Sequence, residues 1–242
     1  MQRNSLLHLP VFFLLLFSGC ESNSQPQEKD TAVIAVPASK DTVYFDHTDT
    51  IYIPDSVKDA IVFPDKALSK WVSFYKKHYA NFDPHTFKAG TKHRFSFDQA
   101  QPFTTPGTHD DSLAQLLYCW SPDKNYIVDI YSVRYFFVEH NGKTTLEGGD
   151  PESGIRLTSL KKKTTWLIAY TGSMQSFDDV AWLDSTHFVV TGDISISEDS
   201  LQPYYEVFDL EQRTAGWFDG PIVRRKNSKS YLCTKFPEYC AE

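Results

Sequence analysis

The sequence predicts a mainly β fold of the α+β class, an antiparallel sheet or sandwich with one or two helices. Three observations predict it. From residue 90 to the C-terminus, short runs rich in Val, Ile, Tyr, Phe and Thr alternate with turn residues, as is typical of strands and hairpins. One earlier stretch has helical spacing instead. From Tyr44 onward the chain also holds 33 aromatic residues in 199, enough to fill one well-buried core.

The first expected elements are a hairpin and a helix. Residues 42–45 and 50–53 are β-rich and flank the polar residues 46–49, which favours a hairpin. Pro64 and Asp65 suit the first turn of a helix. Large apolar side chains then recur near helical spacing along one face, at Leu68, Trp71, Tyr75 and Phe82. We interpret this aromatic stripe as core packing rather than as a ligand platform.

Strands are expected through most of the remaining chain. Asn141-Gly142 between two β-rich segments is a strong hairpin signal, because both turn residues must tolerate positive φ. A short helix is expected at residues 110–117. The predicted strands are residues 94–97, 126–131, 136–138, 156–160, 165–170, 187–194 and 204–209, with a return at 215–218.

The N-terminus has the pattern of a secretion signal. Arg3 is the only charged residue among the first nineteen, and residues 6–17 are apolar except at two positions. Twelve helical residues reach roughly 18 Å, which is too short for a hydrocarbon core of about 30 Å. Such a segment suits the apolar region of a signal peptide. Small residues follow, and then Cys20.

The run Phe17-Ser18-Gly19-Cys20 resembles the lipobox of bacterial lipoproteins, with Phe17 where that family usually has leucine. The resemblance implies cleavage before Cys20, acylation of its thiol and amine by chains such as palmitate, and a stable membrane anchor held by lipid. It also implies an exported protein of the cell envelope, with the outer membrane favoured over the inner. The alternatives are an ordinary secretory signal beside a chance cysteine and a transmembrane anchor.

These features divide the chain into three parts. Residues 1–19 form the predicted signal peptide, residues 20–43 the lipidated cysteine and a flexible tether, and residues 44–242 a single mostly β domain. The tether assignment depends on residues 21–43, which contain no aromatic side chain and are rich in Ser, Gln, Pro, Asp and Lys.

Three cysteines remain after Cys20. Cys233 and Cys240 flank a short bend at Phe236-Pro237, where a local disulfide is easy to close, and we predict this bridge. Cys119 is then the odd thiol. Its apolar neighbours favour a small buried hydrophobic residue over a reactive nucleophile.

An internal repeat links two turn-and-strand segments. Residues 119–123 (Cys-Trp-Ser-Pro-Asp) lead into one expected strand, and residues 181–185 (Ala-Trp-Leu-Asp-Ser) lead into another. The first copy resembles the Ser-Pro-Asp turn of TolB-type β-propeller repeats, and residues 207–217 resemble the outer hairpin of a blade. Lys124 stands where those repeats usually carry glycine, and a closed propeller needs at least about four blades. The resemblance therefore implies locally propeller-like hairpins, not a closed propeller, and it carries no function.

Charge and motifs exclude several classes of function. The formal net charge is −7, and no block of like charge stands out except Lys161-Lys162-Lys163. A chain without a basic face argues against nucleic acid and against electrostatic attraction to anionic lipid. No serine-hydrolase elbow, zinc-binding histidine motif or nucleotide-binding glycine loop is present, so we predict no catalytic residue, metal or cofactor.

Two acidic clusters have a structural interpretation. His109-Asp110-Asp111 suits a solvated loop with a helix N-cap better than a metal site. Asp178-Asp179 is the acidic pair most worth mutating, and we interpret it as a turn that caps the following strand.

We therefore expect a non-enzymatic, lipid-anchored envelope protein whose β domain binds a protein or glycan partner. One alternative is an envelope hydrolase that uses a non-local carboxylate pair, drawn from Asp129, Glu139, Asp178, Asp179 and Asp193. Another is an inhibitor or immunity-type protein. A cleft joining two acids with raised pKa would favour the hydrolase, and a flat or aromatic-rimmed face would favour binding.

Overall fold

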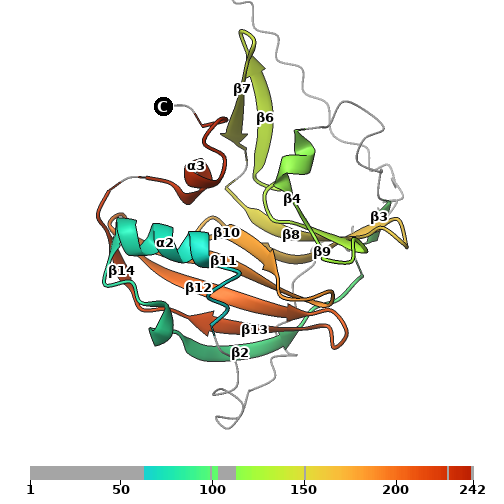
Figure 1. Cartoon of the computed structure of the whole chain (residues 1–242), viewed down its shortest axis with the longest axis horizontal. Coiled ribbons are helices and arrows are strands. Elements are labelled where there is room, and N and C mark those ends of the chain that lie inside the picture. The colour runs from blue at the N-terminus through green and yellow to red at the C-terminus, as the bar shows by residue number, and fades with distance from the viewer. Residues whose placement is uncertain (1–62, 99, 103–112, 150, 228, 241–242) are drawn as a thin grey trace, which may run out of the picture. The chain divides into compact units, whose positions relative to one another are not determined.

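A computed structural model describes residues 63–98, 100–102, 113–149, 151–227 and 229–240 (Figure 1). The chain divides into two compact units, residues 1–45 and 46–242, and every described residue belongs to the second unit. The signal peptide, Cys20, the tether and the hairpin expected at residues 42–53 lie outside the described residues. The described part is mostly antiparallel sheet with two α-helices and no closed barrel or propeller, so the predicted fold class is confirmed.

The larger sheet has seven strands, all antiparallel to their neighbours. β12 (Ser200–Asp209) is central, and it pairs with β11 (His187–Ser197), β13 (Thr214–Asp219) and β14 (Val223–Arg225). The other members are β10 (Gln175–Trp182) beside β11, β2 (Lys88–Arg94) beside β13, and β1 (Tyr79–Ala80) beside β14. β10 is therefore an edge strand of this sheet.

A second sheet has five strands, and a separate hairpin accompanies it. The order is β3 (Ala100–Pro102), β9 (Thr164–Thr171), β8 (Ser153–Ser159), β5 (Tyr126–Asp129) and β4 (Tyr118–Trp120). The hairpin joins β6 (Tyr135–His140) to β7 (Lys143–Gly148). Asn141 and Gly142 at its turn both have positive φ, 52° and 77°, so the hairpin prediction is confirmed.

The two sheets pack face to face around one hydrophobic core, which we call the sheet core. Ile155 and Leu157 of β8 meet Phe188 of β11 and Phe208 of β12, all of them fully buried. Along β8, β11 and β12, alternate residues point into this core, as the period of two in a strand requires. Burial of each such side chain stabilises the fold by about 1.5–3 kcal/mol.

The opposite face of the seven-stranded sheet is covered by α2 (Ser69–His78), which crosses it in Figure 1. Trp71 and Tyr75 of the helix pack there with Val189 of β11 and Tyr205 of β12, and we call this second cluster the helix core. The aromatic stripe thus points inward, as expected. The helix begins later than expected, because residues 65–68 form a turn, and Phe82 lies beyond its end while still packing edge-on against Trp71.

Two expected elements differ from the structure. The strand expected at residues 94–97 lies upstream, at β2, because Arg94 is the last residue that pairs with β13 and Phe95 turns into the sheet core. The helix expected at residues 110–117 is a short 3-10 turn, Ala114–Leu117, within the part of that segment that is described. Further short elements are a 3-10 turn at Pro84–Thr86 and the helix α3 (Tyr231–Lys235).

The two copies of the internal repeat contact each other. Trp182 donates its indole N–H to the carbonyl of Cys119 at 3.0 Å, which joins the end of β10 to β4. The turn that follows each copy is closed by an aspartate. Asp123 accepts a hydrogen bond from the backbone of Asn125, and Asp184 accepts from the backbone of Thr186. The repeat therefore reflects two hairpin turns with the same capping chemistry.

Candidate functional site

A cavity of about 330 Å³ opens beside α2, where β10 and β11 meet the residues that lead into α3. Its wall residues come from segments that are far apart in the sequence. The polar and aromatic side chains that matter most are Tyr75, Tyr79, Arg134, Asp178, Asp193 and Arg225. This volume is at the lower end of the range for small-molecule sites.

A β-bulge places two successive aspartates on the helix side of β10. Phe177 pairs with Gly192 of β11 and Asp179 pairs with the adjacent Thr191, so Asp178 is left without a partner on β11. Phe177 and Val180 both point into the sheet core, so the two residues between them both face the helix core. In a regular strand one of these two carboxylates would point between the sheets. The expected turn at Asp178-Asp179 is therefore wrong, since both residues lie inside a strand.

Asp178 and Asp193 share one hydrogen-bond partner, the phenol of Tyr75. Its oxygen lies 2.7 Å from Oδ2 of Asp178 and 3.0 Å from Oδ2 of Asp193. Trp71 also donates its indole N–H to Asp178 at 3.0 Å. The distance between the two Oδ2 atoms therefore cannot exceed the sum of their distances to the phenol oxygen. Two of the five acids named for the hydrolase alternative, Asp178 and Asp193, therefore lie close together, on neighbouring strands.

This arrangement retains a proton between the two carboxyl groups. Burial raises the pKa of Tyr75 well above its usual value, so the phenol keeps its single hydrogen and donates it to one carboxylate. The phenol lies within hydrogen-bond distance of both carboxyl groups but has only this one hydrogen, so it cannot donate fully to both. Burial, with the charge of Asp193 added, raises the pKa of Asp178 to about 8. The pair therefore holds one shared proton at neutral pH.

Positive charge balances the pair from the cavity wall. Burial raises the pKa of Asp193 as well, while the hydrogen bond from Tyr75 and the charge of Arg225 oppose that rise. Arg225 lies opposite Tyr79 in the β1–β14 pair, and the ring of Tyr79 stacks on Tyr75 at 4.6 Å between centroids. The cavity thus combines an acidic floor, formed by Asp178 and Asp193, with a cationic wall at Arg225 and the aromatic faces of Tyr75 and Tyr79.

Asp179 has a different role, because it holds α3 against the sheet. Its two carboxylate oxygens contact the hydroxyl of Tyr231 and the ammonium of Lys235, both from α3. Cys233 and Cys240 are bonded in the structure, with 5.4 Å between their Cα atoms, and they close the chain around the end of this helix. α3 supplies wall residues to the cavity, so Asp179 and the disulfide support the site without lining it.

Cys119 is a free thiol that packs at the margin of the sheet core. It is partly buried, and its Sγ donates to the carbonyl of Val180 at 3.6 Å. Burial raises the pKa of this thiol, which lowers the fraction of thiolate available for reaction. A packing role fits these observations.

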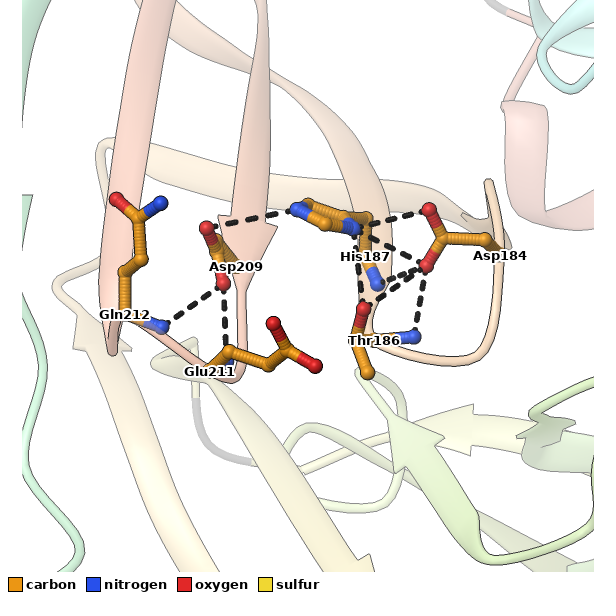
Figure 2. Close-up of polar contacts among 6 residues, drawn as sticks. All are labelled: Asp184, Thr186, His187, Asp209, Glu211 and Gln212. Atoms are coloured by element: carbon orange, nitrogen blue, oxygen red, sulfur yellow. Dashed lines mark hydrogen bonds and ion pairs between the residues drawn. The ribbon is translucent and has the colours of Figure 1, made fainter.

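A second polar cluster surrounds His187, and Figure 2 shows its contacts. The imidazole lies between Asp184, 2.9 Å from Nδ1, and Asp209, 3.4 Å from Nε2. Both aspartates also accept backbone N–H groups, Asp184 from Thr186 and Asp209 from Glu211. The cluster therefore joins two hairpin turns, and its polar groups are satisfied by one another.

Some expectations about chemistry fall outside the described residues. The segment His109-Asp110-Asp111 and the lipid-attachment residue Cys20 are both in this group. Within the part of the chain that the structure describes, no three His, Cys, Asp or Glu side chains gather where they could hold a metal ion. No helix there is both long enough and apolar enough to cross a bilayer.

Comparison of the chain with protein-family models, with curated proteins and with solved structures found no match.

Proposed function

We propose that this chain is an exported lipoprotein, anchored to the cell envelope through lipid on Cys20, whose β domain binds a glycan group in the cavity described above. The anchor rests on the signal-like residues 1–19 and on the lipobox resemblance. It is tested by the change Cys20→Ala, which should move the protein from the membrane fraction to the soluble fraction of the envelope. Retention of the variant on membranes would rule out lipid on this cysteine as the anchor.

The binding proposal rests on one observation, the convergence of carboxyl, guanidinium and aromatic groups in a cavity of about 330 Å³. Carboxyl groups accept hydrogen bonds from pairs of sugar hydroxyls, and aromatic rings such as Tyr75 and Tyr79 offer flat apolar faces with a polar edge. A few fixed polar groups in a concave site are the usual basis of ligand orientation. The acidic floor and the cationic wall together suit a ligand with many hydroxyl groups.

The experiment is a glycan-binding screen with the full-length protein and two matched variants. Asp193→Asn changes the cavity floor, whereas Asp199→Asn changes an exposed acid in the turn between β11 and β12. We expect a glycan that binds the unaltered chain and the Asp199→Asn variant, and that binds the Asp193→Asn variant roughly tenfold more weakly, the loss of one charge-assisted hydrogen bond. Equal binding by all three proteins would place the glycan elsewhere and refute the cavity as its site.

One observation favours a hydrolase as the second candidate. The Asp178–Asp193 pair holds one proton between two carboxyl groups, which supplies an acid and a base in the same cavity. Glycosidases that retain configuration place their two carboxyl groups about 5–5.5 Å apart. A glycan that binds and is then cleaved, with cleavage lost in both Asp178→Asn and Asp193→Asn, would establish this candidate over simple binding.

A further inference from the structure

A second hollow, of about 810 Å³, is lined by residues of α2 and α3, including Tyr231. Both hollows share the wall residues Phe74, Lys229 and Tyr231, and the rings of Phe74 and Tyr231 meet edge-on at 5.2 Å. We call this second hollow the lysine groove, after the five lysines that line it: Lys66, Lys70, Lys77, Lys229 and Lys235.

The α2 side of the lysine groove alternates ammonium and hydroxyl groups. The lining residues on this side include Lys66, Ser69, Lys70, Ser73 and Lys77. The last four follow Lys66 by three, four, seven and eleven positions. These spacings place all five on one face of the helix and of the turn before it. From Ser69 to Lys77 this face extends roughly 12 Å along the axis.

The charge of the groove is opposite to that of the whole chain. The formal net charge of the protein is −7, yet five lysines line this one hollow. Its only acidic lining residue is Asp179, whose carboxylate is already paired with Lys235. Among the described residues, no acid forms an ion pair with the other four lysines. The expectation of a chain without a basic face is therefore wrong, because the fold gathers lysines that are more than 150 positions apart.

Helix stability does not account for these lysines. A positive charge in the last turn of a helix is favourable, which explains Lys77. Lys66 and Lys70, however, lie at the N-terminal end of α2, where the helix dipole disfavours a cation, and this first turn contains no acidic residue. Like charges that converge in one hollow also repel one another. Both costs would be offset by an anionic ligand in the groove.

We propose that the lysine groove binds an anionic oligosaccharide, one that carries carboxylate groups along a chain of sugar hydroxyls. The interleaved Lys and Ser side chains complement that pattern, and the mobile ammonium groups suit carboxylates at varied angles. A membrane surface is flat, whereas these lysines surround a hollow. A nucleic acid has a dense line of phosphates, which the acidic remainder of the domain repels. Lys66, Lys70 and Lys77 line the groove and not the cavity, so the proposal does not depend on a ligand in the cavity.

The test is titration calorimetry of the full-length protein with tetragalacturonate and, as an uncharged counterpart, with tetragalactose. The groove variant carries Lys66→Gln, Lys70→Gln and Lys77→Gln together. The control variant carries Lys161→Gln, Lys162→Gln and Lys163→Gln, which removes the same charge from the exposed β8–β9 turn. Because all the substituted side chains are at the surface, both variants should fold, and circular dichroism checks this.

We expect the unaltered chain to bind tetragalacturonate and not tetragalactose. The groove variant should bind it at least roughly tenfold more weakly, and the control variant with nearly unchanged affinity. Equal weakening in both variants would refute a specific groove and leave only general attraction. Binding of a single-stranded oligonucleotide or of phosphatidylglycerol vesicles, but not of tetragalacturonate, would overturn the proposal in favour of those partners.

The chain's own acidic segment is the remaining possible occupant. Residues 46–59 carry four aspartates and one lysine just before α2. If tetragalacturonate binds only after Asp46, Asp49, Asp55 and Asp59 are changed to Asn, the groove holds that segment and the glycan proposal is wrong.

Discussion

The shared proton of the Asp178–Asp193 pair leads to a prediction about stability and pH. Asp178→Asn replaces the carboxyl group by a neutral amide of the same shape, whose oxygen can take the place of Oδ2 and accept from both Trp71 and Tyr75. The amide therefore imitates the protonated form of Asp178 at every pH. We expect this variant to lose much of the pH dependence that the pair gives to folding.

The sign follows from the direction of the pKa shift. The pKa of Asp178 rises from 3.8 to about 8 on folding, so the folded chain retains a proton that the unfolded chain releases within this window. The stability contributed by this group is complete below the unfolded value and is lost as the pH rises through the folded value. A shift of about four units has an upper limit of about 6 kcal/mol, at about 1.4 kcal/mol per unit. Because Asp193 shares the proton, we expect about 3 kcal/mol.

The assay is urea denaturation at a series of pH values for three proteins. Between about pH 5 and about pH 8, the stability of Asp178→Asn should rise relative to that of the unaltered chain by about 3 kcal/mol. Asp199→Asn, which removes an exposed acid, should follow the unaltered chain. A constant difference between Asp178→Asn and the unaltered chain at all pH values would refute the reasoning, because Asp178 would then be ionised in the folded protein.

Three further predictions concern residues that support the fold. Burial raises the pKa of Glu206 to about 8, so Glu206→Gln should gain stability relative to the unaltered chain as the pH rises from about 5 to about 8, by up to about 5 kcal/mol; a difference that stays constant across this window would instead indicate an ionised Glu206 in the folded protein. A Cβ at Gly192 would lie 1.9 Å from the carbonyl oxygen of Ser176, so Gly192→Ala should lower the free energy of unfolding by about 3 kcal/mol or more, and an unchanged melting temperature would contradict that close contact. Cys233→Ser should cost about 2–3 kcal/mol in denaturant titration by opening the loop to Cys240, and equal stability of the reduced and oxidised unaltered chain would show that the bridge contributes little.

Local sequence signals predicted the elements whose structure depends on neighbouring residues. Asn141-Gly142 specifies its hairpin because the turn itself demands positive φ at both residues. The apolar stripe of α2 predicted the buried face because the period of a helix is regular. The start of β2 was misplaced, since it is decided by pairing with β13, a partner more than 100 residues away.

The candidate site was less accessible to sequence reasoning. Asp193 was among the possible acids, but its partnership with Asp178 requires the register of β10 on β11 and the bulge between them. Alternation within a single strand does not reveal a bulge. Tyr75 was recognised only as part of an apolar stripe, although its hydroxyl is the group that joins the two acids. Local spacing reveals only one side of the lysine groove, the lysines of α2, because Lys229 and Lys235 of the other side come from the opposite end of the domain.

The bulge in β10 also suggests how such a strand can acquire a new side chain without giving up an old one. One extra residue in a central strand would turn every later side chain of that strand to the other face and would shift its pairing with two neighbours at once. β10 is an edge strand, so only its pairing with β11 has to adjust, and the pattern resumes after one unpaired residue. Position 179 can then remain committed to α3 while position 178 is free to vary. Homologous sequences that lack one residue here should retain the partner of α3 and lose the acid that faces the cavity.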